Sequence, residues 1–393
     1  MDEKSKERLK EMREQLLLEM PRLLHYWKQN SWDAENHVFI TLGCDNRPLK
    51  SGKRSTVLAA RILWAFSSAF RLNHDTGCRE MADQAYEDLT VHYLDRVYGG
   101  AFESLCADGT VLNDSKVVYT QTYLIYGLSE YYLASGCTEA LETAIEIFQT
   151  VEKYSRDPLT DGYAASCRRD WSPEKGLLTV DTYLHLTEAY TNLYKAWPDA
   201  CLKESLRRIA NLLLDRWIRP NGALFQTLQA DWKETDDLSD RFADDAECAW
   251  MILEAAAQMN EPPLTERVNR TVSLLTEHIA VDGYDTEHGG VFDRSYPDGH
   301  IDDGKMWWEE SESVIGLLYG YRETKEPLLL EKALGTWDFL RKYIIDPTGE
   351  WKWKTQADGT YIEPKNPSDP LKCPYHGTRI SVLCIPLIDE ICN

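Results

Sequence analysis

A repeat of about 60 residues constrains the fold of this chain more than any other feature, because a fixed period is typical of helical arrays and toroids. Each repeat is marked by a short turn, most often with glycine, next to an aromatic residue. The markers are residues 35–39, 98–102, 161–163, 221–225, 288–292 and 348–351. Asp-Gly turns at 107–109, 297–299 and 357–359 follow three of them. Such turns are typical of short β-hairpins.

Helical pairs are predicted between the markers. Apolar residues recur at i, i+3, i+4 and i+7 in segments such as 61–70, 119–131, 246–255 and 312–321. One helix of each pair is the more apolar, which predicts an inner ring wrapped by an outer ring. Six pairs closing on themselves predict an all-α fold, a single (α/α)6 barrel with short β-hairpins in the loops at the active-site end. No Pro/Ser-rich break divides the sequence, so we expect residues 1–393 to form one domain.

The composition narrows the classes of partner. The net charge of −22 would repel a phosphate backbone and an anionic membrane surface, so we expect neither nucleic acid nor membrane as a partner. No apolar run is long enough to span a bilayer, and the charged N-terminus does not resemble a signal peptide. The 10 cysteines show no zinc-type spacing, which favours reduced thiols in the cytoplasm. The 13 Trp and 21 Tyr serve mostly the core, but rings also line sugar-binding clefts.

Five polar residues stand out because polar groups on inner helices are costly unless they are paired or face a cavity. His376 lies in Cys-Pro-Tyr-His, just before the apolar stretch 380–391, and His185 lies inside a helical run. Arg61, Glu247 and Glu312 lie on apolar helices. An imidazole can transfer a proton near neutral pH without a metal. We therefore expect these residues to face one central cavity and to perform proton transfer on a sugar.

Each candidate also has a structural interpretation. His376 and His185 could be buried histidines of the core, and the two glutamates could be ion-pair partners of an arginine. Trp307 and Trp308 are adjacent, so we expect at most one of the two indoles to line the cavity.

Several of these segments resemble the N-acylglucosamine 2-epimerase superfamily, and most of all its cellobiose 2-epimerases. The resemblance lies, in the same order along the chain, in residues 61–64, 119–131, 185–190, 307–316 and 373–376. It implies an (α/α)6 barrel that acts as an epimerase or aldose–ketose isomerase on the reducing end of a mono- or disaccharide. It also implies a reaction without metal or cofactor, and a monomer or homodimer.

The resemblance implies roles for individual residues. Arg61 would bind the oxygen that becomes the enediolate, His185 would assist ring opening, and His376 would exchange the C2 proton. Glu247 and Glu312 would orient the histidines. The residues expected to contact the sugar are Tyr119, Asp181, Trp250, Trp307 and Trp308. A proton next to a carbonyl becomes removable when a cation holds the developing oxyanion, so these assignments are chemically consistent.

Three positions depart from the family pattern. Asp244 stands where relatives carry a third histidine, so either Asp244 acts as the second base or the reaction changes. Leu371 replaces a tryptophan on which a second sugar ring would stack, and Asp181 replaces an asparagine. These departures weaken the assignment to disaccharide 2-epimerisation in particular.

Three functions remain open at this point. The first is an epimerase or isomerase, in which a single base would favour aldose–ketose isomerisation. The second is a glycoside hydrolase that uses Asp181 and Asp244, for which a carboxylate separation of about 5 Å indicates retention and one of about 6.5–9.5 Å inversion. The third is a sugar-binding protein that has lost its proton-transfer partner.

Overall fold

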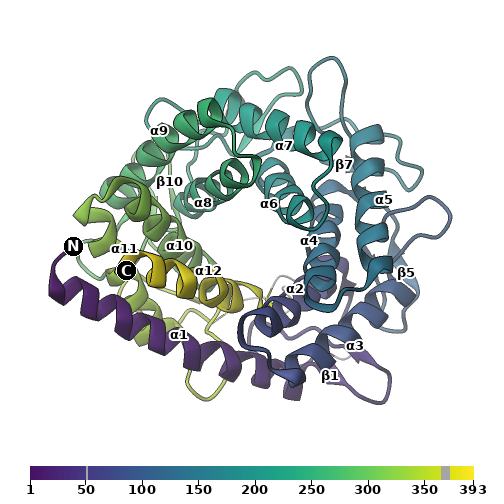
Figure 1. Ribbon diagram of the computed structural model, residues 1–393, viewed down its shortest axis with the longest axis horizontal. Coiled ribbons are helices and arrows are strands. Elements are labelled where there is room, and N and C mark those ends of the chain that lie inside the picture. Colours follow the sequence, from purple (N-terminus) through teal and green to yellow (C-terminus); the bar gives the residue numbers. More distant parts are fainter. Residues whose placement is uncertain (50–51, 364–371) are drawn as a thin grey trace.

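Two concentric rings of helices form the protein, as the computed structural model shows for residues 1–49, 52–363 and 372–393 (Figure 1). The inner ring consists of α2 (Thr56–Asn73), α4 (Val118–Ser135), α6 (Val180–Ala196), α8 (Phe242–Met259), α10 (Trp307–Thr324) and α12 (Tyr375–Cys392). The outer ring consists of α1 (Glu3–Asn30), α3 (Thr76–His92), α5 (Thr138–Tyr154), α7 (Ala200–Leu212), α9 (Pro262–His278) and α11 (Pro327–Phe339). Each inner helix contacts the next, and α12 contacts α2, which closes the ring. The predicted (α/α)6 barrel is confirmed.

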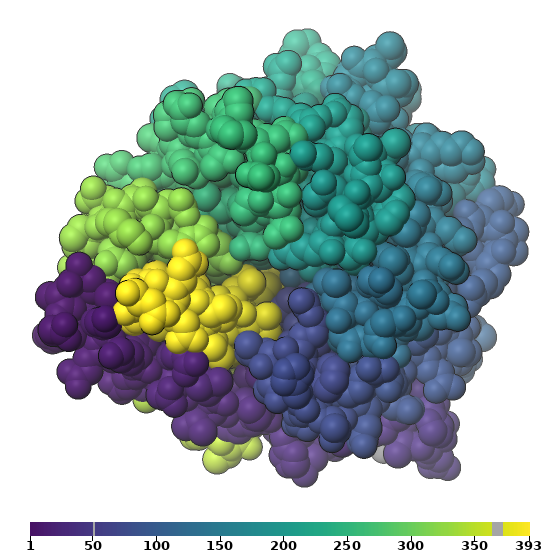
Figure 2. All heavy atoms as spheres, viewed as in Figure 1, coloured from purple at the N-terminus to yellow at the C-terminus, as the bar shows by residue number. Residues whose placement is uncertain are grey.

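The burial of the helices follows their sequence patterns. In α2 every residue from Thr56 to Ala69 is buried, because this inner helix is covered on all sides. In α5 the buried residues are Ala140, Ala144, Ile147, Phe148 and Val151, which is the single apolar stripe of an outer helix. Side chains of the inner ring fill the centre that the ribbon leaves open (Figure 2). The outer helices α7, α9 and α11 each continue into a π-helical turn: η1 (Leu213–Trp217), η2 (Ile279–Gly283) and η3 (Leu340–Ile344).

The two ends of the barrel differ in the length of their connections. Inner helices pass to their outer partners through turns of a few residues, four of which contain a left-handed residue: His74, Gly136, Asn260 and Lys325. The long connections, which carry the sequence markers, all lie at the opposite end. They hold the strands β1 (Trp32–Asp33), β2 (Val38–Phe39), β3 (Arg54–Ser55), β4 (Ser104–Leu105), β5 (Val111–Asn113), β6 (Lys116–Val117), β7 (Ser166–Cys167), β8 (Leu178–Thr179), β9 (Thr227–Leu228), β10 (Arg294–Ser295), β11 (Ile301–Asp302), β12 (Lys305–Met306) and β13 (Lys354–Thr355).

Strand pairing links neighbouring connections around this end. The strand that leads into an inner helix pairs with the strand that follows the next outer helix, as in β3 with β4, β6 with β7, β8 with β9 and β12 with β13. The predicted Asp-Gly hairpins also form, as β4 with β5 and β10 with β11, and as a bridge between Thr355 and Tyr361. Pairing therefore joins each of these described loops to its neighbour at this end of the barrel.

A hydrogen bond that recurs around the ring explains why the markers repeat. In four inner helices the side chain of the fourth residue accepts a backbone N–H from the preceding marker. The acceptors are Gln121, Tyr183, Asp245 and Glu310, and the donors are the amides of Ala101, Tyr163, Leu224 and Val291. Each marker is thus tied to the start of the helix that follows it. Among the described residues, no helix is both long and apolar enough to cross a membrane.

Candidate active site

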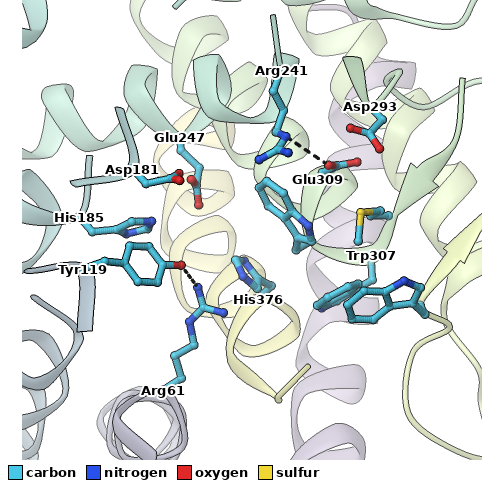
Figure 3. Close-up of a pocket in the computed structure, with 13 residues that line it drawn as sticks. Arg61, Tyr119, Asp181, His185, Arg241, Glu247, Asp293, Trp307, Glu309 and His376 are labelled. Atoms are coloured by element: carbon cyan, nitrogen blue, oxygen red, sulfur yellow. Dashed lines mark hydrogen bonds and ion pairs between the residues drawn. The ribbon is translucent and has the colours of Figure 1, made fainter. Parts of the chain in front are cut away.

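A cavity of about 260 Å³ lies at the N-terminal ends of the inner helices, beneath these loops (Figure 3). Its described lining residues are Arg61, Tyr119, Asp181, His185, Arg241, Glu247, Asp293, Met306, Trp307, Trp308, Glu309, Trp353 and His376. The sequence-predicted residues Arg61, His185, Glu247 and His376 therefore share one cavity with Tyr119, Asp181 and the two tryptophans.

The register of the inner helices explains this convergence. The sixth residue of α2, α4, α6, α8 and α10 is respectively Arg61, Tyr123, His185, Glu247 and Glu312. Equivalent positions on similarly oriented helices lie at one level and point toward the barrel axis. The first member, Arg61, donates to the hydroxyl of Tyr123 at 2.6 Å and to that of Tyr119 at 3.0 Å.

His376, the second residue of α12, is buried to 3% exposure. Its Nδ1 lies 2.8 Å from Oε1 of Glu312. Glu312 also accepts from Nε of Arg379 at 3.0 Å and from the indole N–H of Trp250 at 3.1 Å, so it is the acceptor toward His376 as well. Nη2 of Arg379, which can only donate, lies 3.4 Å from the same Nδ1, but the bond to Glu312 is the shorter. The shorter bond places the ring proton on Nδ1 and leaves the basic lone pair on Nε2. Burial lowers the pKa of His376 well below 6.5, and the charge of Arg379 adds to the effect, so the imidazole is neutral near pH 7.

His185 is held by a different carboxylate from the one expected. Its Nδ1 lies 2.9 Å from Oε2 of Glu188, one helical turn along α6, and 3.2 Å from the hydroxyl of Tyr123. The expectation that Glu247 orients a histidine is therefore wrong for His185. Glu247 instead accepts from Nη2 of Arg379 at 2.7 Å.

Arg379, which sequence reasoning missed, joins these carboxylates. Its fully buried guanidinium lies 2.5 Å from Glu188, 2.7 Å from Glu247 and 2.6 Å from Glu312, which come from α6, α8 and α10. Such multiple charge-assisted bonds fix both partners. The available signal was helical spacing, because Arg379 and Glu188 each follow a candidate histidine by three residues.

The carboxylates around Arg379 differ in protonation. Burial opposes ionisation of Glu188, but Arg379 and His185 together lower its pKa to about 2. Burial raises the pKa of Glu247 well above 4.5, and the neighbouring charge of Glu312 adds to the rise. These effects favour the protonated form of Glu247, which lines the cavity together with the neutral imidazole of His376.

Several expectations need correction. Glu312 and Trp250 do not line the cavity, because Glu312 lies behind His376 and Trp250 donates to Glu312. Trp307 and Trp308 both line it, contrary to the expectation for adjacent indoles. They begin α10 at the cavity edge, where Trp307 packs on Trp353 and Trp308 lies near His376.

Asp244 is also absent from the lining, although it is the third residue of α8. It is 1% exposed, and burial raises its pKa to about 7 against the opposing charge of Arg241, while Asp181 contributes to the rise. Leu371 lies outside the described residues, so its predicted effect on a second sugar ring stays a prediction.

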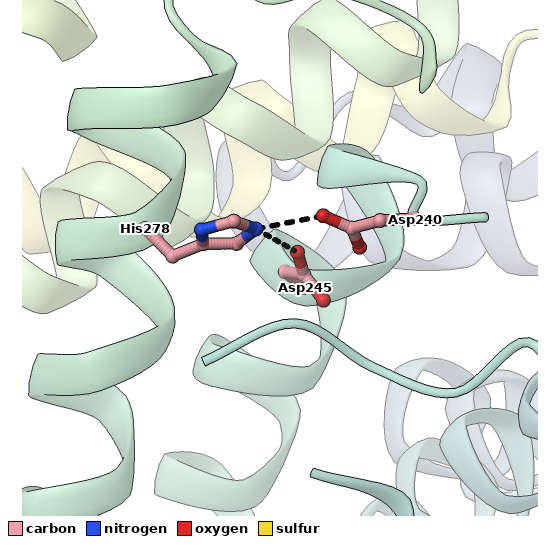
Figure 4. Close-up of side chains that lie close together, drawn as sticks. All are labelled: Asp240, Asp245 and His278. Atoms are coloured by element: carbon pink, nitrogen blue, oxygen red, sulfur yellow. Dashed lines mark hydrogen bonds and ion pairs between the residues drawn. The ribbon is translucent and has the colours of Figure 1, made fainter. Parts of the chain in front are cut away.

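Two clusters within the described ranges have metal-type side chains. In Glu247, Glu312 and His376 the guanidinium of Arg379 already occupies the cation position. The other cluster is Asp240, Asp245 and His278, at the start of α8 and the end of α9 (Figure 4).

Both ring nitrogens of His278 already have partners in this second cluster. Nε2 lies 2.7 Å from Asp240 and Nδ1 lies 2.8 Å from Asp282. Burial would lower the pKa of His278, but these two carboxylates outweigh it and raise the pKa. The arrangement therefore links two helices through hydrogen bonds, and the raised pKa favours the imidazolium form of His278.

Other proteins share both the sequence and the architecture. The model of the N-acylglucosamine 2-epimerase family matches residues 38–377. A cellobiose 2-epimerase of Bacteroides fragilis is 30% identical over 94% of this chain and 96% of its own. The solved structure of cellobiose 2-epimerase from Spirochaeta thermophila has a TM-score of 0.92 at 27% identity and covers 98% of both chains. A solved D-mannose isomerase, with a TM-score of 0.84 at 18% identity over 95% of this chain and 97% of its own, shares the fold. The chain belongs to the N-acylglucosamine 2-epimerase family.

Proposed function

We propose that the protein is a carbohydrate 2-epimerase or aldose–ketose isomerase that exchanges the C2 proton of a reducing-end sugar through an enediolate. The family and its relatives named cellobiose 2-epimerase support this activity. The observation that carries it is the cavity in which His376, His185 and Arg61 meet. It combines a neutral base, a second imidazole and a cation, which are the groups that enolisation requires.

The proposed reaction begins when His185 assists opening of the sugar ring. Nε2 of His376 then takes the C2 proton, while Arg61 stabilises the negative charge that develops on the carbonyl oxygen. Glu312 supports His376, because its carboxylate accepts the Nδ1 proton and stabilises the imidazolium that forms.

The fate of the enediolate decides between two products. Return of the proton by His376 to C1, with transfer of the O2 hydroxyl proton to O1, gives a ketose. Delivery of a proton to the other face of C2 gives the epimer and requires a second donor. Glu247 lines the cavity, and its raised pKa favours the protonated form that can supply this proton, whereas Asp244 lies outside the lining. The same placement of Asp244 disfavours glycoside hydrolysis by an Asp181–Asp244 pair, since only Asp181 borders the cavity.

The test is incubation with glucose, mannose, cellobiose and lactose in deuterated water, followed by NMR. Deuterium at C2, together with an epimer or a ketose, is expected for at least one sugar. His376→Ala should abolish exchange, while His25→Ala, on the exposed face of α1, should retain it. Near-normal exchange by His376→Ala, or release of a monosaccharide without exchange, would contradict the proposal.

We further propose that the protein works in the cytoplasm as a monomer or homodimer. The free thiols of Cys167 and Cys373 and the net charge of −22 support this setting. Size-exclusion chromatography with light scattering, and fractionation of the source cells, would test both statements.

A further inference from the structure

Glu309 is a buried acid without a hydrogen-bond partner among the described residues. It is the third residue of α10, lines the cavity and is 1% exposed, yet neither carboxylate oxygen accepts a hydrogen bond from the described part of the chain. At the same position of other inner helices, Thr120 bonds to Glu103 and Thr182 bonds to Thr179. The position is therefore satisfied within the protein where the residue is a threonine, but not at Glu309.

Arg241, the residue before α8, lies next to Glu309 in the lining of the cavity. Its Nε lies 3.9 Å from Oε1 of Glu309, which is an ion pair but is longer than a hydrogen bond. The guanidinium lies 5.7 Å from the ring of Trp308, and Nε has no hydrogen-bond partner within the described ranges. Both members of the pair keep unused hydrogen-bonding capacity, and both line the cavity.

Unused capacity of this kind is costly in a buried site. A buried polar group without a partner loses about 1–3 kcal/mol relative to its state in water, and more when it is charged. A sugar hydroxyl suits the pair because it can accept a proton from a guanidinium while donating its own to a carboxyl oxygen. Asp293 lines the same wall, and Nζ of Lys354 lies 2.6 Å from it, so its charge is already balanced within the protein.

We propose that Arg241 and Glu309 bind a pair of hydroxyl groups of the sugar and thereby select which sugar the enzyme accepts. In Figure 3 the two residues lie next to each other at the top of the view, with His376 below them and with Tyr119 and His185 at the left. The hydroxyls concerned are accordingly remote from the reacting C1–C2 bond, at C3, C4 or C6. This assignment rests on the proposed function, because it places the C1–C2 bond beside His376.

The protonation of Glu309 favours a neutral ligand. Burial raises its pKa well above 4.5, the charge of Asp293 adds to the rise, and Arg241 opposes it. A carboxylic acid both donates and accepts a hydrogen bond but does not attract an ammonium group. A hydroxyl group can bond to Glu309 in either protonation state, whereas an ammonium group requires the ionised form.

The test measures sugar binding and exchange separately. Trp307 and Trp308 line the cavity, so quenching of tryptophan fluorescence reports the Kd without turnover. The probe is whichever of glucose, mannose, cellobiose and lactose binds, together with its 3-, 4- and 6-deoxy analogues. For the wild type we expect one or two of these analogues to bind about 10- to 100-fold more weakly, as the loss of a hydrogen bond to a charged group implies.

The variants decide whether this selectivity comes from the pair. In Glu309→Ala and Arg241→Ala, binding of the parent sugar should weaken by about the factor that the missing hydroxyl costs in the wild type. The deoxy analogue that the wild type binds weakly should bind to both variants with its wild-type Kd. KM should rise more than kcat falls. Glu309→Gln, which keeps a donor and an acceptor, should restore part of the affinity, and Glu266→Ala, from an exposed ion pair on α9, is the matched control.

The proposal would be overturned if Glu309→Ala bound the parent sugar with wild-type affinity. It would also be overturned if Glu309→Ala lost affinity equally for the parent sugar and for every deoxy analogue. If the wild type binds sugar but catalyses no exchange, the proposed reaction fails while the binding test still decides this inference. Binding of none of the four sugars by the wild type would overturn both.

Discussion

At the scale of single residues, the site depends on a histidine that is kept uncharged. His376 is buried, and Arg379 and Arg61 add positive charge nearby, so its pKa lies well below 6.5. A general base works only when it is deprotonated, and it loses that form as the pH falls through its own pKa. We therefore expect kcat/KM for C2 exchange to persist below pH 6.5 and to decline only at more acidic pH. A pH–rate profile with its acid limb centred at or above pH 6.5 would contradict this.

Glu312 acts on the reaction through His376. Glu312→Gln removes the acceptor charge that stabilises the imidazolium, so we expect kcat to fall by about 100-fold, within the range for general base catalysis, with a smaller change in KM. The acid limb of the profile should also move to lower pH. The imidazolium of His376 loses the carboxylate that stabilises it, which lowers the pKa of His376. Glu323→Gln, near the other end of α10, is the control and should leave both quantities unchanged. An unshifted profile in Glu312→Gln would assign Glu312 a structural role only.

Asp244 offers a gain-of-function test. An imidazole side chain is longer than that of aspartate. The imidazole introduced by Asp244→His should therefore reach from the third position of α8 toward the cavity and provide a second proton-transfer group. We expect the ratio of C2 epimer to ketose to rise, as measured by NMR of the product mixture. An unchanged ratio would show that the second group must come from elsewhere, with Glu247 as the next residue to replace.

At the scale of elements, neighbouring inner helices pack closely where a glycine faces the next backbone. A Cβ on Gly316 of α10 would lie 2.7 Å from the carbonyl oxygen of Ala246 in α8, and one on Gly127 of α4 would lie 2.7 Å from that of Ala60 in α2. Backbone atoms cannot move aside as a flexible side chain can. Gly316 therefore sets the spacing of the helices that carry Glu247 and Glu312, and Gly127 sets the spacing of α2 and α4.

Gly316→Ala should force α10 away from α8. We expect a loss of about 1–3 kcal/mol in the free energy of unfolding, as for other overpacked cores, measured by urea denaturation. Gly176→Ala is the matched control, because no atom lies within 4 Å of its added Cβ, and it should change stability by less than about 0.5 kcal/mol. Equal effects of the two substitutions would refute the close-packing argument.

At the scale of the whole molecule, the first and last helices close the ring. α1 contacts α12, so the two ends of the chain support each other (Figure 1). The buried side chain of Leu23 in α1 packs on Gly377, the neighbour of His376. The N-terminal helix therefore supports the proposed base from behind, although it contributes no described residue to the cavity lining.

Leu23→Ala should affect both stability and the site. We expect a loss of about 2–5 kcal/mol on unfolding, as for other buried leucines, and a lower kcat because α12 gains freedom next to His376. Leu18→Ala, on the same helix but 76% exposed, should change neither. A destabilised Leu23→Ala protein with full kcat would show that α1 does not position His376.

The amino-acid pattern alone was sufficient to predict the helices and their pairing into a barrel. It also predicted that Arg61, His185, Glu247 and His376 face one cavity. The reason is that burial imposes a local period on each helix, and a polar residue that interrupts it is visible in one stretch of sequence. The family resemblance added their proposed chemistry.

Ring closure, in contrast, decided which charged groups meet. Glu188, Glu247 and Glu312 come from three helices and converge on Arg379 of a fourth, so no local spacing reveals their contact. The same holds for Arg241 and Glu309, whose pairing depends on how α8 packs against α10. Protonation states follow from burial and from neighbours distant in sequence, and both exist only once the barrel has formed.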